Sequence, residues 1–176
     1  KEIVNFQNLK SLYLSANKLQ AKDFEWIASL KSLEELYLDY NELKEFPLPI
    51  LELTGLKILD LSNNKISKLP KELSKLTKLE DLDLSMNKLN GFPDQIIGLQ
   101  QLKILGLSKN GISKLPKEIL KLRQLEALSL GMNNFQAFPQ ILKKMQHLKI
   151  LSLYDNPFPE EECESEIKKM PWLGNY

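Results

Sequence analysis

Leu79-Glu-Asp-Leu82-Asp-Leu84-Ser-Met-Asn87 is the stretch that decides the fold of this chain. Apolar and polar residues alternate along it, which is the pattern of a β-strand with one buried face. The phrase Leu-x-x-Leu-x-Leu-x-x-Asn occurs seven times, first at an interval of 24 residues and then at intervals of 23. Each copy ends on an asparagine: Asn17, Asn41, Asn64, Asn87, Asn110, Asn133 and Asn156. A fixed period in this range predicts a solenoid whose strands stack into one parallel sheet.

The residues within one copy divide into an inward and an outward set. Leu82 and Leu84 are predicted to point into the core, and Asp81 and Asp83 to point outward. The asparagine ends the strand, and its carboxamide can both donate and accept hydrogen bonds. We expect the asparagines to form a ladder that bonds main-chain groups of adjacent turns, because a buried unpaired peptide group costs about 1–3 kcal/mol.

The second half of a repeat reads Leu-Pro-x-x-Leu-x-x-Leu, as in residues 69–76. The prolines recur in phase at Pro47, Pro70, Pro93, Pro116 and Pro139. Proline fixes φ and donates no hydrogen bond, so it suits an outer arc that begins a short helical or 3₁₀ segment. A wide outer arc over a narrow strand layer curves the stack, which predicts an α/β solenoid with its parallel sheet on the concave face.

The chain is predicted to form one domain over residues 1–176. Residues 9–156 carry the seven strand motifs. Residues 1–8 match the tail of a repeat, because Lys-Glu-Ile at 1–3 aligns with Lys-Glu-Leu at 71–73, and we expect the natural protein to extend further at its N-terminus. Residues 157–176 are predicted to form a C-terminal capping helix and tail.

The two ends depart from the repeat pattern. In the first repeat Asp23 is a candidate helix N-cap, and the spacing of Phe24, Ile27 and Leu30 predicts a short α-helix with one buried face. Near the C-terminus four glutamates precede two lysines, an order that suits the helix dipole. The apolar stripe of the expected capping helix, and the aromatic residues expected to assist it, are Cys163, Ile167, Met170, Trp172 and Tyr176.

One column of residues alternates in charge from strand to strand. It reads Lys10, Glu34, Lys57, Glu80, Lys103, Glu126 and Lys149. Opposite charges on neighbouring strands favour pairing by roughly 0.2–1 kcal/mol per pair. We therefore interpret this column first as a structural ladder that joins neighbouring strands, and only second as a partner-binding site.

Composition limits the possible functions. The formal net charge of +1 argues against bulk electrostatic binding to nucleic acid, and no apolar run is long enough to cross a membrane. The single cysteine, Cys163, allows no internal disulfide, and the single histidine, His147, shares no repeat position with it. No catalytic residues, cofactor site or zinc cluster are predicted. Weak cation binding at Asp60, Asp81 and Asp83 is an alternative for the acidic residues of the sheet.

The outward positions of the strands are the predicted binding surface. Among the three outward positions of each copy, five are acidic and none is basic, while many lysines lie on the arc. This predicts a protein partner with a basic or mixed surface. Tyrosines adjoin the acidic stretch, and tyrosine is a favoured interface anchor. The predicted partner-binding residues are Tyr13, Glu35, Tyr37, Asp39, Tyr40, Asp60, Asp81, Asp83, Ile104, Met132 and Tyr154.

The strand phrase, the even 23-residue Leu-Pro spacing and the Asn-Pro-x-Pro ending at 156–159 resemble the leucine-rich repeat family, notably short-spacer bacterial proteins of spirochaetes. The resemblance implies a right-handed horseshoe that binds proteins and has no catalytic activity. It also implies export, to a secreted or cell-surface location, and binding to a host protein. A cytoplasmic eukaryotic scaffold is the alternative location. Two other functions stay open: the recognition arm of a larger enzyme or receptor, and a glycan-binding module. The oligomeric state is left open.

Overall fold

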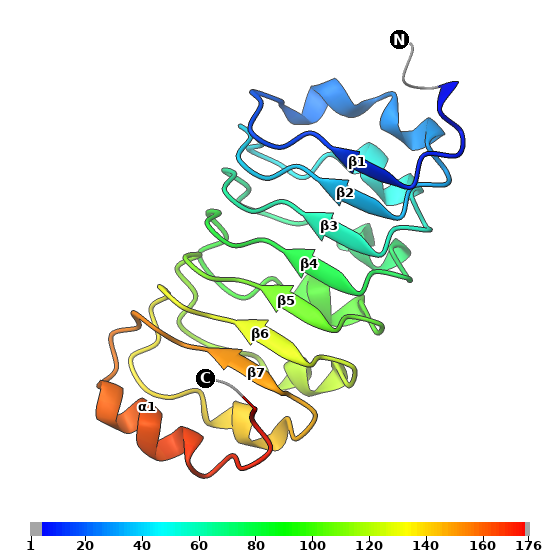
Figure 1. Cartoon of the computed structure of the whole chain (residues 1–176). Coiled ribbons are helices and arrows are strands. Elements are labelled where there is room, and N and C mark those ends of the chain that lie inside the picture. The colour runs from blue at the N-terminus through cyan, green and yellow to red at the C-terminus, as the bar shows by residue number, and fades with distance from the viewer. Residues whose placement is uncertain (1–4, 175–176) are drawn as a thin grey trace.

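The computed structural model describes residues 5–174 and confirms the solenoid. Seven strands form one parallel sheet in sequential order, so each strand pairs with the next along the chain (Figure 1). The strands are β1 (Ser11–Tyr13), β2 (Glu35–Tyr37), β3 (Ile58–Asp60), β4 (Asp81–Asp83), β5 (Ile104–Gly106), β6 (Ala127–Ser129) and β7 (Ile150–Ser152). Residues 1–3, on which the match to an upstream repeat rests, lie outside the described residues.

The inward and outward assignment of the strand residues is confirmed. Leu82 is 1% exposed and Leu84 is fully buried, whereas Asp81 and Asp83 are half-buried. The register is exact from strand to strand, so that Leu82 lies between Leu59 and Leu105. Equivalent leucines thus stack in rows along the solenoid and form one continuous core.

Short 3₁₀ helices make up the convex side. They are η2 (Ala21–Phe24), η3 (Ile27–Ser29), η4 (Leu48–Glu52), η5 (Lys71–Lys75), η6 (Asp94–Gly98), η7 (Lys117–Lys121) and η8 (Gln140–Lys144). A proline is the N-cap residue of each of η4 to η8, as the spacing predicted. In η5 the buried Leu73 accepts a 3.1 Å bond from the N–H of Leu76, which closes the arc and returns the chain to the sheet.

The first repeat differs from its prediction. Phe24, Ile27 and Leu30 are fully buried as expected, but they lie on two 3₁₀ turns, η2 and η3, and not on one α-helix. The bonds there join residues three apart, which is the 3₁₀ pattern. Asp23 is also not the N-cap. Gln20 holds that position, and the Asp23 carboxylate accepts a 2.8 Å bond from the Gln20 N–H, because a side chain at the third helical position can reach back to the cap.

The asparagine ladder is confirmed. Asn64 donates to the carbonyls of Leu38 in the preceding turn (2.9 Å) and Leu61 in its own turn (3.1 Å), and its Oδ1 accepts from the N–H of Leu43 (3.0 Å). Asn41, Asn87, Asn110, Asn133 and Asn156 bond in the same way. The first rung is incomplete: within the described residues Asn17 bonds only to its own turn. Each complete rung therefore satisfies main-chain groups of the turn before its asparagine.

A left-handed residue precedes every asparagine of the ladder. The residues at this position are Ala16, Tyr40, Asn63, Met86, Lys109, Met132 and Asp155, with φ between 52° and 58°. For a residue with a Cβ this conformation costs roughly 1–2 kcal/mol. The bend is retained because it aims the carboxamide at the buried peptide groups.

The C-terminal segment continues the repeat in modified form. An α-helix, α1 (Glu160–Ile167), replaces the 3₁₀ arc, and Ile167 and Met170 are buried against the core. The Gly174 N–H donates to the Lys149 carbonyl (2.8 Å), as the Lys149 N–H donates to Glu126 in the turn before (2.7 Å). The segment thus follows the ladder of the sheet beyond β7 (Figure 1). Trp172 is partly buried there, and Tyr176 lies outside the described residues.

Candidate functional site on the concave sheet

The tyrosines at the N-terminal end of the sheet form a stack. Tyr13 and Tyr37 are register partners on β1 and β2, and their rings lie 4.5 Å apart at 3°. Tyr13 is 65% exposed, while burial and the charge of Glu35 raise the pKa of Tyr37. Tyr40, also exposed, follows β2 at the left-handed position and is not part of the stack. The structure therefore joins two of the three predicted tyrosines into one flat aromatic surface.

The nearby carboxylates accept hydrogen bonds from other side chains of the protein. Glu35 accepts a 2.9 Å bond from the Ser11 hydroxyl, and Asp39 accepts one from the Ser15 hydroxyl. Both serines lie one turn earlier in the stack. These two predicted binding residues consequently also hold neighbouring turns together.

The aspartates in the middle of the sheet are less well satisfied. Asp60 and Asp83 each accept a bond from the backbone N–H two residues later, at 2.8 and 2.7 Å. Asp81 accepts no hydrogen bond from any described residue, and burial, assisted by Asp83 and Asp60, raises its pKa to about 6. Burial also raises the pKa of Asp60. None of these three carboxylates is in a salt bridge within residues 5–174.

Lysines near the sheet are paired with other glutamates. Glu34 lies between Lys10 (2.6 Å) and Lys57 (2.5 Å), whose hydrogen bonds lower its pKa to about 2. The same column pairs Lys103 with Glu80 (2.7 Å) and Lys149 with Glu126 (2.8 Å). The charge ladder is thus confirmed for these pairs, while the remaining neighbours in the column form no salt bridge within the described residues. The Lys57 carbonyl accepts a 3.0 Å bond from the Asp81 N–H, but the Lys57 ammonium is paired with Glu34.

A hollow of about 340 Å³ opens over the C-terminal half of the sheet. Gly106 and Ser129 line it, and Asp83 borders it because Gly106 has no side chain: a Cβ there would lie 2.3 Å from the Asp83 Oδ1. A Cβ on Gly131 would lie 2.3 Å from the Tyr154 ring, so this glycine admits the tyrosine. The other side chains that line the hollow are Asp81, Ser85, Met86, Ile104, Ser108, Lys109, Met132, Ser152 and Tyr154.

Sequence reasoning named the acidic and apolar borders of this hollow, and it also marked Gly106 and Gly131 as small outward residues that admit close contact. The equivalent positions in other copies carry aspartate, serine or tyrosine. A glycine at an outward strand position often marks a close approach of another group. That signal was present in the sequence and points to the same place.

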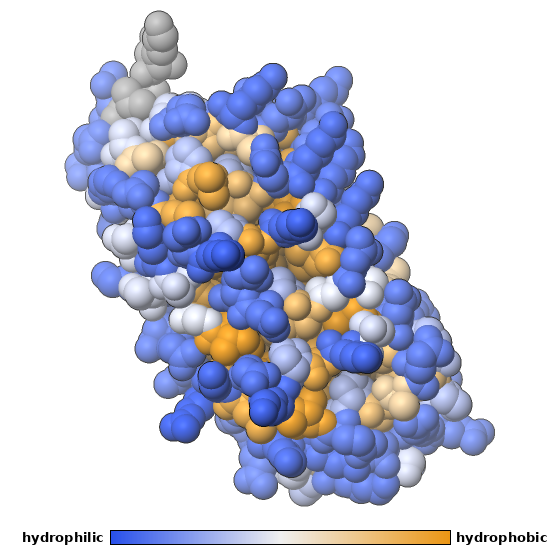
Figure 2. All heavy atoms as spheres, turned by 180° about the vertical axis from the view of Figure 1, so that it is seen from behind, coloured by the Kyte–Doolittle hydropathy of each residue, from blue (hydrophilic) through white to orange (hydrophobic). Residues whose placement is uncertain are grey.

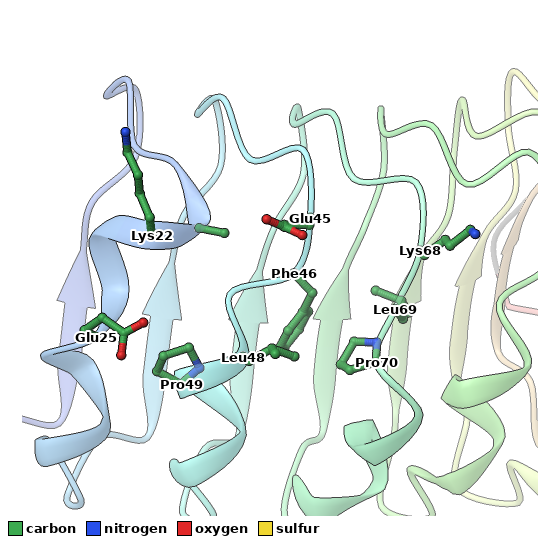
Figure 3. Close-up of a pocket in the computed structure, with 10 residues that line it drawn as sticks. Lys22, Glu25, Glu45, Phe46, Leu48, Pro49, Lys68, Leu69 and Pro70 are labelled. Carbon is green, nitrogen blue, oxygen red and sulfur yellow. The ribbon is translucent and has the colours of Figure 1, made fainter.

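Further hollows in the described part of the chain lie outside the one over the concave sheet, and the two larger ones are as follows. One, of about 420 Å³, lies between the first arcs (Figure 3). Phe46 and Leu69 are its buried apolar residues, and Lys22 and Glu45 are among the charges of both signs around it. The other, of about 560 Å³, lies between β7 and α1 and includes Cys163. Seen from behind the view of Figure 1, apolar patches run along the molecule but are interrupted by hydrophilic side chains (Figure 2).

The aspartates of the sheet, Cys163 and His147 were the candidates for metal binding or nucleophilic chemistry. Within residues 5–174 no set of three or more His, Cys, Asp or Glu side chains could hold a metal ion, so Asp60, Asp81 and Asp83 do not form such a set. Burial and surrounding glutamates raise the pKa of the Cys163 thiol, which disfavours a reactive thiolate. His147 lies 3.0 Å from the Leu122 carbonyl, a structural contact. No helix in the described part of the chain has the length and apolar character needed to span a bilayer.

Solved structures with the same fold come from bacteria and from a plant. A leucine-rich repeat protein of Leptospira interrogans is 32% identical, with a TM-score of 0.85 over 99% of this chain and 50% of that one. An internalin of Listeria monocytogenes is 26% identical, with a TM-score of 0.83 over 98% and 48%. A plant peptide hormone receptor in complex with RGF2 is 28% identical, with a TM-score of 0.74 over 99% and 29%.

Sequence comparisons give the same family over parts of the chain. Models described as "Leucine rich repeat" and "Leucine Rich repeats (2 copies)" match residues 3–46 and 54–94. The chain spans only 2% of a probable serine/threonine-protein kinase of Dictyostelium discoideum, which is 54% identical over 46 residues, and 16% of rat osteomodulin, which is 41% identical over 69. Repeats, fold and relatives agree that the chain is a leucine-rich repeat solenoid protein that resembles spirochaetal members of that family.

Proposed function

We propose that this chain is a non-catalytic protein-binding module that holds its partner on the concave sheet. Leucine-rich repeat proteins generally mediate protein–protein interactions, and the relatives found here are typically recognition modules. The observation that carries the concave site is the half-buried Asp81, whose carboxylate pairs with no described residue, next to a hollow with exposed apolar borders. A partly desolvated carboxylate that has no cation beside it favours a partner that brings a basic side chain.

The proposal includes an exported protein, secreted or at the cell surface, that binds a host protein. Its support is the similarity to the Leptospira protein and to the Listeria internalin over nearly the whole of this chain. The chain spans about half of each of those proteins, so the role of the full-length protein belongs to the same proposal.

A comparative pull-down tests the concave site. The baits are this chain and a variant carrying Tyr37→Ala, Asp60→Lys and Asp83→Lys. A control variant with Asp94→Lys and Glu118→Lys makes the same change in net charge on η6 and η7 of the convex side. Circular dichroism confirms that all three are folded. We expect a partner that is retained by the chain and the control and lost from the first variant; equal retention by all three would move the site off the sheet.

Two other functions have an observation of their own. The short spans of the plant receptor and the Dictyostelium kinase that this chain matches favour a recognition arm of a larger protein, which the full open reading frame would decide. The stacked Tyr13 and Tyr37 offer the flat aromatic surface on which sugar rings pack, which favours glycan binding. Glycan-array binding that disappears in Tyr37→Ala would support that second function over a protein partner.

A further inference from the structure

The hollow over β4 to β7 combines a charge and an apolar row in one column of the sheet. Asp81 on β4 is the register partner of Ile104 on β5, which is followed by Ala127 on β6 and Ile150 on β7. Ile104 is 46% exposed and Ile150 50% exposed. Exposed aliphatic side chains that flank a small residue form a shallow apolar seat. The column therefore begins with a carboxylate and continues as an apolar surface.

The charges that face Asp81 come from the sheet itself, and they are mainly negative. Asp83 and Asp60 lie beside it and disfavour its ionised form. Lys109 lines the same hollow, but it belongs to the exposed left-handed position after β5 and forms no salt bridge with any described carboxylate. An incoming cation would thus relieve repulsion that the protein leaves in place.

From this column we infer that the concave hollow binds a segment of the partner protein in the polyproline II conformation, in which a Lys or Arg is three residues from an aliphatic residue. The basic side chain lies between Asp81 and Asp83, and the aliphatic side chain packs on Ile104, Ala127 and Ile150. The inference rests on the proposed function and specifies the chemistry of its partner.

Strand spacing fixes the separation of the two side chains. The centre of the apolar row, Ala127, lies two strands beyond Asp81. Two strand spacings of about 4.8 Å are matched by one turn of polyproline II, three residues at about 3.1 Å each, which also places the first and fourth side chains on the same side. The Asp83 carboxylate and the Tyr154 ring fill the space above Gly106 and Gly131, so the segment crosses the sheet along the row of Ile104, Ala127 and Ile150.

Synthetic peptides test this directly. The probe is the fluorescein-labelled hexapeptide Ser-Arg-Ser-Ser-Leu-Ser, titrated at low salt against the isotopically labelled protein. Control peptides replace Arg with Glu, or place Arg and Leu side by side. We expect the probe to shift the amide resonances of Gly106 and Ser129, and both control peptides to bind more weakly. No shift at millimolar peptide, or equal binding of the Glu peptide, would overturn the inference.

Matched protein variants locate the two contacts. Asp81→Asn keeps the shape of the side chain and should weaken probe binding about fivefold, since a partly exposed charge pair contributes up to about 1 kcal/mol. Asp94→Asn on η6 makes the same charge change and should have no effect. Ile104→Ser should also weaken binding, whereas Leu48→Ser, at an exposed leucine on η4, should not.

The same variants separate this inference from the proposed function. If a captured partner is lost from the Tyr37, Asp60 and Asp83 variant yet is retained by both Asp81→Asn and Ile104→Ser, the concave site stands and the stated partner chemistry is wrong. A captured partner that the Arg peptide displaces, and the Glu peptide does not, supports both.

Discussion

The two halves of the concave face share a backbone and differ in how their side chains are satisfied. Over β1 and β2 the outward layer is closed on itself: Tyr13 stacks on Tyr37, and serines of the preceding turn bond Glu35 and Asp39. Over β4 to β7 it is open, with glycine at the base of a hollow and an Asp81 carboxylate that accepts no hydrogen bond from the described residues. The difference shows that in a repeat protein the buried core determines the shape of the solenoid. The position of the binding site depends on the outward groups that lack a partner within the protein.

The largest expected effect tests whether the halves share one core. Leu38 and Leu107 hold the same repeat position in the two halves, and both are fully buried. We expect Leu38→Ala and Leu107→Ala each to lower the free energy of unfolding by about 2–5 kcal/mol through the cavity left behind. Urea unfolding measures both. A clearly smaller loss in one half would show that the two cores are not equivalent.

The second comparison is between the middle and the end of the asparagine ladder. Asn87→Ala removes bonds to two turns and should lower the free energy of unfolding by about 1–3 kcal/mol. Asn17→Ala removes bonds to its own turn at an exposed position and should lower it less. Thermal melts of the two variants decide this, and equal losses would contradict the view that each rung serves the preceding turn.

The period of the sequence is enough to predict most of the fold. Leucine, proline and asparagine recur at fixed positions, and stacking forces equal positions into equal environments, so the sheet, the arcs and the ladder follow. The first repeat escaped the prediction because Phe24, Ile27 and Leu30 are compatible with both an α-helix and 3₁₀ turns, and the short return to the sheet favours the tighter turns.

The site was less predictable, because it depends on pairing between neighbouring copies. The composition of the outward positions marks Glu35 and Asp81 as equally acidic. Only the structure shows that a serine one turn earlier bonds the first and that no described residue bonds the second. The hollow depends in the same way on which side chains lie over Gly106 and Gly131.

The open half should also respond to pH. The pKa of Asp81 is raised to about 6 in the folded protein, above its ordinary value of 3.8. The folded state therefore holds this proton more tightly, so the destabilisation from ionised Asp81 is present above pH 6 and is removed as the pH falls from 6 to 4. Asp81→Asn should stabilise the protein at pH 7, by about 1 kcal/mol or less after allowance for solvent screening, and the gain should disappear near pH 4.

Melting curves of this variant and of Asp94→Asn, collected from pH 4 to pH 8, provide the measurement. Probe binding to the hollow should weaken over the same pH range, since protonated Asp81 offers no charge to a basic side chain. If Asp81→Asn stabilised the protein equally at every pH, the raised pKa of Asp81 would not be the cause of the gain.

The smallest expected effect concerns a feature that both halves share and that the repeat pattern did not predict. Tyr40 and Lys109 hold the left-handed bend before the asparagine in β2 and β5 repeats, with φ of 53° and 54°. Glycine adopts this conformation without a Cβ penalty but has more freedom to lose on folding. We expect Tyr40→Gly and Lys109→Gly to raise the free energy of unfolding by about 0.5 kcal/mol, the difference between those two contributions. The matched variant Lys109→Ala should bring no gain, because it retains the Cβ. If alanine stabilised as much as glycine, the gain would come from losing the lysine side chain, and the bend would not be the strained element.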